Sequence, residues 1–329
     1  MKSLEDKLDS AMGALIGAAV GDALGAPLEF LTPRIDKEDW ETEMCGGGVL
    51  KWQPGDITDD TIMSLAVSEM YLEAGGYNQR TLVEKWVHWQ KSGPKDIGNW
   101  TNAVLSKWNG YLRATEDVKI DVMGIEHPAI KLWIDAGKRD AGNGGLMRCM
   151  PTALWEPMLT DRIEQTTRIC MDSHPDVRCI ETCILEVEML HEMIERSMDK
   201  KEAMFFMHKL VKDFIKNDEI IDSIKGIENK KWGDTNNGGY TVDSIESALS
   251  GFYLSENFED GLVAVVNKGN DADTVGAIAG ALMGAFYGYK AIPDRWLDAL
   301  VNTDQLLDIS EKLFTRRLKV QKESVQEMP

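Results

Sequence analysis

The stretch KGNDADTVGAIAGALMGAFYG (residues 268–288) decides the fold, because it places a glycine at every fourth position of an apolar segment. A second stripe with the same spacing lies near the amino terminus. The two stripes are Gly276, Gly280, Gly284 and Gly288, and Gly13, Gly17, Gly21 and Gly25. A glycine inside a helix costs about 1 kcal/mol relative to alanine, so four in one helix predict the close approach of another helix. Each stripe could pack against a bulky side chain, but we expect the two stripes to pack against each other.

Acidic residues stand at the ends of these stripes. Antiparallel packing would bring Glu29, which follows the first stripe, close to Asp271 and Asp273, which precede the second. A third acidic cluster begins the segment TDDTIMSLAVSEMYLEAGG (residues 58–76). The three clusters consist of Glu29; of Thr58, Asp59 and Asp60; and of Asp271, Asp273 and Thr274. Any one of them could simply cap a helix, but capping does not explain two adjacent carboxylates that repel each other.

Carboxylates that converge in space need cations. A ligand set made only of carboxylate and hydroxyl oxygens selects Mg²⁺ or Mn²⁺ over zinc or copper. The number of acids suits two divalent ions. Such ions would also attract an anionic ligand, which the formal net charge of −19 would otherwise repel.

Helical periodicity dominates the chain. The segment at residues 58–76 begins with a capping threonine and ends in two glycines, and most other apolar segments repeat at helical spacing, with almost no strand-like alternation. We therefore predict an all-α protein. No linker rich in Pro, Gly or Ser divides the chain, so we predict a single domain over residues 1–329. We predict that residues 192–231 form a charged helical insertion and that residues 316–329 form a polar tail that frays.

The composition indicates the cellular compartment and argues against some classes of partner. Five cysteines at irregular spacing suit a reducing compartment, and the charged amino terminus lacks the apolar core of a signal peptide, so we expect a cytoplasmic protein. The longest apolar run, residues 275–289, is short for a bilayer span, so we expect no membrane. The strong negative charge makes a nucleic-acid partner unlikely. We expect a monomer.

Four sequence blocks carry a resemblance to a known family. They are GALIGAAVGDALGAPLEF, TDDTIM, GNGGLMRCMP and NKGNDADTVGAIAGALMGAFYG, in this order. At these blocks the sequence resembles the ADP-ribosylglycohydrolases. The resemblance implies a compact orthogonal multi-helix bundle with a dinuclear Mg²⁺ or Mn²⁺ centre. It also implies that the metal ligands are Glu29, Thr58, Asp59, Asp60, Asp271, Asp273 and Thr274.

The resemblance further implies residues that contact the substrate. The loop AGNGGLMR (residues 141–148) matches the segment that cradles the ribose and phosphates, and consecutive glycines can form an anion-binding nest. This assigns Gly142, Asn143, Gly144 and Gly145 to substrate binding. Arg148 could pair with a phosphate or anchor the loop. An ordinary tight turn is the alternative for the loop as a whole.

The resemblance places three more residues near the substrate, and each of them also has a simpler structural explanation. His174 lies in a block near the family's site, but before Pro175 it could be structural. Tyr240 matches an aromatic residue that packs near adenine, or it is an ordinary tyrosine at a helix start. Asp96 matches an acid near the substrate in bacterial members, or it is a turn aspartate.

These assignments imply hydrolysis of the bond at C1″ of the distal ribose in an ADP-ribosylated protein or small molecule, with protein arginine as the expected acceptor. The ions would hold the ribose hydroxyls and lower the pKa of the attacking water. Glu29 would move between metal and substrate, and Asp59, Asp60 and Asp96 are the other candidate catalytic acids. The alternatives are a non-catalytic ADP-ribose-binding or crystallin-like member, and a dinuclear hydrolase acting on another ADP-ribose derivative or a phosphoester.

Overall fold

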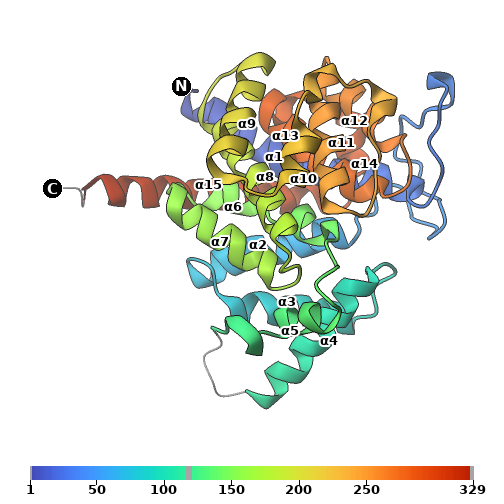
Figure 1. The fold of residues 1–329 in the computed structure, drawn as a ribbon. Helices are drawn as coiled ribbons and strands as arrows, with labels where there is room; N and C mark the ends of the chain where they lie inside the picture. Colours follow the sequence, from blue (N-terminus) through green and yellow to red (C-terminus); the bar gives the residue numbers. More distant parts are fainter. Residues whose placement is uncertain (1, 116–120, 327–329) are drawn as a thin grey trace.

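A computed structural model describes residues 2–115 and 121–326, with side chains up to residue 321. Over these residues the chain forms α-helices joined by loops and short 3₁₀ turns, with no strand, as the sequence predicts (Figure 1). The α-helices are α1 Leu4–Gly25, α2 Asp59–Ala74, α3 Gln79–Lys91, α4 Asn99–Ala114, α5 Pro128–Asp135, α6 Pro151–Trp155, α7 Leu159–Met171, α8 Val177–Glu195, α9 Lys200–Phe214, α10 Asp218–Ile224, α11 Thr241–Leu254, α12 Phe258–Val266, α13 Ala272–Tyr287, α14 Asp294–Ala299 and α15 Thr303–Gln326.

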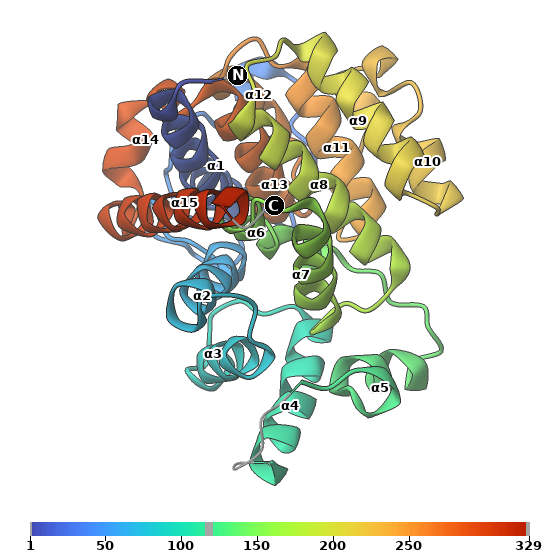
Figure 2. The ribbon, with the colours of Figure 1, turned by 90° about the vertical axis from the view of Figure 1, so that its left-hand side faces the viewer.

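Helices α1 and α13 pack antiparallel along their glycine stripes (Figures 1 and 2). A Cβ atom on any of these glycines except Gly288 would overlap a backbone carbonyl of the opposite helix, so only glycine permits the approach. The facing pairs are Gly13 with Gly284, Gly17 with Gly280, Gly21 with Gly276, and Gly25 with Ala272. The prediction that the two stripes meet is therefore confirmed, and the two ends of the chain share one core.

The ends of α1 are fixed by local chemistry. Ser3 and Asp6 form a reciprocal capping box at its start. Its last turn continues into a 3₁₀ turn, η1, at Ala26–Leu28, which Pro27 favours and Glu29 ends. By length and hydropathy α1 with η1 could cross a membrane, but 94% of its most apolar window is buried in the protein. Its apolar surface is therefore satisfied by other helices.

The remaining helices cover this central pair. Helices α8, α11, α12 and α15 lie around α1 and α13, while α2 and α3 lead to α4 and α5 in the lower part of the molecule (Figures 1 and 2). The charged stretch at residues 192–231 forms the end of α8, then α9 and α10. Helix α15 continues through most of the predicted polar tail, whose last three residues lie outside the described part of the chain.

Candidate metal centre and substrate cavity

Three helix ends meet beside one cavity. Because α1 and α13 are antiparallel, the residue after η1 faces the first turn of α13. The first turn of α2 approaches the same point, with Thr58 as its N-cap. A cavity of about 740 Å³ opens there, and Glu29, Asp59, Asp60 and Asp273 line it. The antiparallel seam therefore brings together acids separated by more than two hundred positions.

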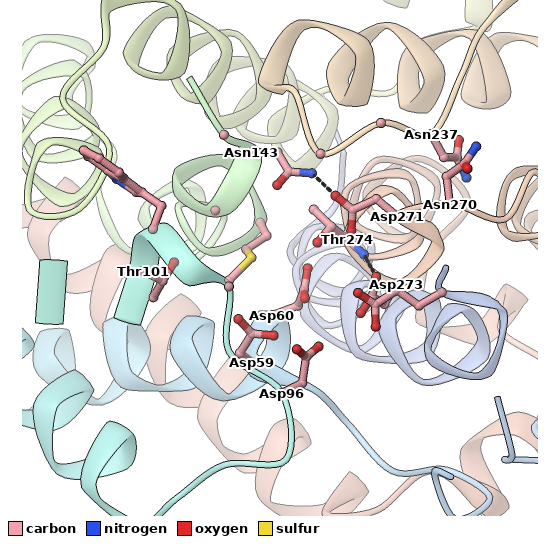
Figure 3. A pocket seen from close by; sticks show the side chains of 18 of the residues that line it. Asp59, Asp60, Asp96, Thr101, Asn143, Asn237, Asn270, Asp271, Asp273 and Thr274 are labelled. Atoms are coloured by element: carbon pink, nitrogen blue, oxygen red, sulfur yellow. Dashed lines mark hydrogen bonds between the residues drawn. The ribbon is translucent and has the colours of Figure 1, made fainter. Parts of the chain in front are cut away.

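Asp96 completes the acidic group from a separate loop before α4. Carboxylate oxygens of Glu29, Asp96 and Asp273 all lie within 4.8 Å of one another. Figure 3 shows Asp59, Asp60 and Asp96 on one side of the cavity and Asp271 and Asp273 on the other. Carboxylates of both sets could therefore hold a shared cation.

Burial and mutual repulsion disfavour the charged form of these acids. Burial, followed by the charges of Asp96, Asp271 and Asp59, raises the pKa of Glu29 to about 9. The pKa values of Asp60 and Asp273 are raised in the same way, first by burial and then by neighbouring carboxylates. Without cations, the Glu29 carboxyl would therefore bind a proton at neutral pH.

The donor set fits hard divalent cations. Glu29 Oε2 and Asp60 Oδ1 are buried without a hydrogen-bond partner, which is costly unless something else binds them. All the converging donors are oxygens, the ligands that Mg²⁺ and Mn²⁺ prefer. Thr274 also lines the cavity, whereas the Thr58 hydroxyl lies behind Asp60 and donates to its Oδ2 at 3.0 Å. The geometry thus fits hard divalent metal ions.

Asp22 is a buried acid that the sequence analysis did not single out. Its carboxylate on α1 accepts hydrogen bonds from the Thr58 backbone N–H at 3.0 Å, from the Thr61 N–H at 3.2 Å and from the Thr61 hydroxyl at 2.5 Å. Burial raises its pKa to about 6, although these hydrogen bonds oppose the shift. The signal in the sequence was an aspartate beside Gly21 in the otherwise small and apolar second half of α1. Asp22 ties α1 to the first turn of α2.

The glycine loop forms the wall opposite the acids. Residues 143–148 make a 3₁₀ turn, η4, and Gly142, Asn143 and Gly144 line the cavity. The Asn143 amide donates to Asp271 Oδ2 at 2.6 Å and to Ser244 at 2.9 Å, which links the loop to the start of α13 (Figure 3). The structure therefore joins two of the predicted blocks by direct contact.

Two residues of the predicted substrate loop face away from the cavity. A side chain at Gly145 would meet the sulfur of Cys170 instead. The Arg148 guanidinium is fully buried, lies 4.7 Å from the Trp86 ring, and donates to Ser173 at 2.5 Å. Of the two roles considered for Arg148, the structure thus favours anchoring the loop, because no phosphate in the cavity could reach a guanidinium held inside the core.

The two remaining predicted side chains differ in position. His174 lines the cavity, and burial and the nearby Arg148 hold its pKa well below the usual range, so the ring is neutral. Tyr240 is the N-cap residue of α11 and lies beside Arg178, whose guanidinium donates to the phenol oxygen at 3.0 Å. Tyr240 is not among the described residues that line the cavity. Trp100 does line it, with its ring N–H fixed to the Ser173 carbonyl at 2.9 Å.

Comparisons with known proteins agree with this arrangement. The sequence profile of the family described as ADP-ribosylglycohydrolase matches residues 3–323. ADP-ribosylarginine hydrolase Tri1 of Serratia proteamaculans (strain 568) is 31% identical over 318 residues, which cover 94% of this chain and 80% of that protein. ADP-ribosyl-[dinitrogen reductase] glycohydrolase of Rhodospirillum rubrum is 32% identical over 305 residues, which cover 89% of this chain and 90% of that protein.

A solved structure of another protein has the same fold. A protein described as an ADP-ribosylglycohydrolase-related protein complex superposes with a TM-score of 0.79 at 28% identity, covering 95% of this chain and 100% of that one. The fold, the relatives and the profile all agree over nearly the whole sequence. The chain therefore belongs to the ADP-ribosylglycohydrolase family and is an enzyme of that class.

Proposed function

We propose that this enzyme hydrolyses the bond between C1″ of the distal ribose and an acceptor arginine, and that it uses two Mg²⁺ or Mn²⁺ ions. One observation carries the proposal: buried carboxylates from α2, α13 and the end of η1, together with a half-buried one from the loop before α4, line one cavity. The name of the Serratia relative, an ADP-ribosylarginine hydrolase, supports arginine as the acceptor.

Seven residues would hold the ions: Glu29, Thr58, Asp59, Asp60, Asp271, Asp273 and Thr274. Bound there, the ions would supply Lewis-acid charge that orients the ribose hydroxyls and stabilises negative charge on oxygen. Thr58 and Asp60 would be presented by the first turn of α2, which Asp22 holds in position.

The wall opposite the acids would bind the rest of ADP-ribose. No lysine or arginine is found among the described residues that line the cavity. The diphosphate would therefore depend on the backbone N–H group of Gly144 and on the charge of the ions, because the Gly142 N–H already donates to Asp140 Oδ1 at 3.3 Å. Asn143 would be fixed by Asp271, so the loop and the acidic cluster would keep a constant spacing.

The acids would also move the proton during hydrolysis. A water oxygen forms a bond to C1″, the bond from C1″ to the guanidino nitrogen breaks, and arginine and ADP-ribose are released. Asp96 is the strongest candidate to accept the proton from that water, because it reaches the cluster from a loop and belongs to neither helix start. The guanidino nitrogen regains a proton as it leaves, so no other reactant is required.

The direct test is a panel of ADP-ribosylated acceptors, each incubated with Mg²⁺ or Mn²⁺, in which release of free ADP-ribose is measured. We expect turnover of ADP-ribosyl-arginine by the wild type, and its loss after chelation or in Asp273→Ala. Asp298→Ala, at an exposed acid on α14, is the matched control and should keep full activity. Undiminished turnover by Asp273→Ala in chelator would overturn the scheme.

A further inference from the structure

Phe30 is an aromatic residue at the mouth of the cavity that contributes little to the core. It follows Glu29 directly and lines the cavity together with Asp96. Its side chain is 60% exposed. A single exposed apolar residue is common on protein surfaces and proves nothing alone. Its backbone conformation supplies a second observation.

Phe30 adopts a left-handed backbone conformation, with φ of 64°. Bulky residues rarely occupy this region, and glycine or asparagine would fit it better. Two hydrogen bonds hold it there: the Phe30 N–H donates to the Asn270 carbonyl at 2.7 Å, and the Asn270 N–H donates to the Leu31 carbonyl at 2.7 Å. The chain therefore keeps a large ring where the backbone favours a small residue and where burial gains little.

The charge around the ring indicates what it could bind. The described residues that line the cavity include the carboxylates of Glu29, Asp59 and Asp96 but no lysine or arginine. Asp96 is not among the proposed metal ligands, so its carboxylate would still attract a cation at the mouth when the ions are bound. A guanidinium is planar and weakly hydrated, and it stacks on aromatic rings more readily than an ammonium group does.

We propose that Phe30 is a specificity-determining residue that stacks on the guanidinium of the acceptor arginine. The proposal rests on the proposed function, because the acceptor must lie next to C1″ and hence next to the acidic cluster. Since Phe30 lines the same cavity as Glu29 and Asp96, its ring would lie within reach of that acceptor. Neutral acceptors would gain much less from this contact.

The test compares two substrates, ADP-ribosyl-arginine and a neutral ADP-ribose ester, by their kcat/KM values. In Phe30→Ala we expect the preference for the arginine substrate over the ester to fall about tenfold, within the range of cation–π contacts. Phe30→Tyr should keep the preference because it keeps the ring. Phe30→Gly should lose the preference and raise Tm, since glycine relieves the left-handed backbone.

Phe205→Ala is the matched control, because Phe205 is a 76% exposed phenylalanine on α9, away from the cavity, and it should alter neither substrate. An equal loss of kcat/KM for both substrates in Phe30→Ala and Phe30→Gly would overturn the inference, since the ring would then only support Glu29. An unchanged preference in both variants would also overturn it. If the wild type releases ADP-ribose from neither substrate with either metal, the proposed function itself fails.

Discussion

At the scale of single residues, Asp22 determines where the first turn of α2 lies. It is fully buried and accepts three hydrogen bonds from Thr58 and Thr61. It touches the turn that carries Asp59 and Asp60 but does not line the cavity. Asp22 is therefore a positioning residue for the proposed metal ligands.

Asp22→Ala should destabilise the Mn²⁺-saturated protein by about 3 kcal/mol, because it leaves three buried donors without an acceptor. It should also weaken Mn²⁺ binding by more than it lowers the affinity of the metal-loaded enzyme for ADP-ribose. Denaturant unfolding and calorimetric titration measure the two effects. Wild-type Mn²⁺ affinity in this variant would contradict the positioning role.

The acidic cluster predicts an unusual pH dependence for the metal-free protein. The folded protein binds the Glu29 proton more tightly than the unfolded chain does, so its contribution to stability is complete below pH 4.5 and is lost as the pH rises through about 9. We therefore expect Tm in chelator to fall between pH 7 and pH 9. This window also lies above the range in which His174, whose pKa is lowered by burial, would titrate in the unfolded chain.

Glu29→Gln is the control for this pH dependence. An amide cannot ionise, so the variant should show a shallower fall of Tm over the same pH range. Saturating Mn²⁺ should flatten the curve of the wild type, because a cation then replaces the protons. If the metal-free wild type gained stability from pH 7 to pH 9, the close burial of these carboxylates would be contradicted.

Residue patterns predicted the acids but not the orientation of their neighbours. Adjacent carboxylates such as Asp59 and Asp60 stand out in a sequence, because they repel each other and are expected where a bound group stabilises them. Arg148 has no such signature: whether a guanidinium meets a ligand or the core depends on Trp86 on α3 and on Ser173 in the turn after α7, which are distant in the sequence. Asp22 was missed because its partners become adjacent only after α1 and α2 pack.

At the scale of elements, the seam between α1 and α13 determines the architecture. Glycine spacing was sufficient to predict that the two helices meet, because every glycine inside a helix has an energetic cost that some contact must offset. The same pattern did not predict how α3, α4 and α5 pack, since their apolar faces would fit many partners. The position of Asp96, on the loop before α4, depends on how α4 packs. Its approach to within 4.8 Å of Glu29 and Asp273 is therefore seen only in the structure.

Gly280→Ala should destabilise the protein by about 3 kcal/mol, because the new methyl group would overlap the Gly17 carbonyl and force the helices apart. Gly110→Ala is the matched control, since Gly110 lies inside α4 with open space around it. There the substitution should stabilise the protein by up to about 1 kcal/mol through helix propensity. Urea unfolding distinguishes the two, and a neutral Gly280→Ala would contradict close packing at the seam.

At the scale of the whole molecule, the proposed ions would link segments that are far apart in the chain. The proposed ligands on α2 and at the start of α13 lie beside one cavity (Figure 3), which Glu29, after η1, also lines. A metal concentration one hundred times the dissociation constant should therefore raise the free energy of unfolding by about 2.7 kcal/mol per independent site. Thermal unfolding with and without Mn²⁺ tests this, and an Asp273→Ala protein should show a much smaller shift.

The pairing of α1 with α13 also constrains how the protein is made. The ribosome must synthesise nearly 250 residues after Gly25 before Ala272, its partner across the seam, exists. At a translation rate of about 5–20 residues per second, the face of α1 that packs on α13 stays uncovered for roughly 12–50 seconds. Nascent chains stalled before α13 should therefore depend on chaperones, and the metal ligands cannot assemble until translation of the last helices is under way.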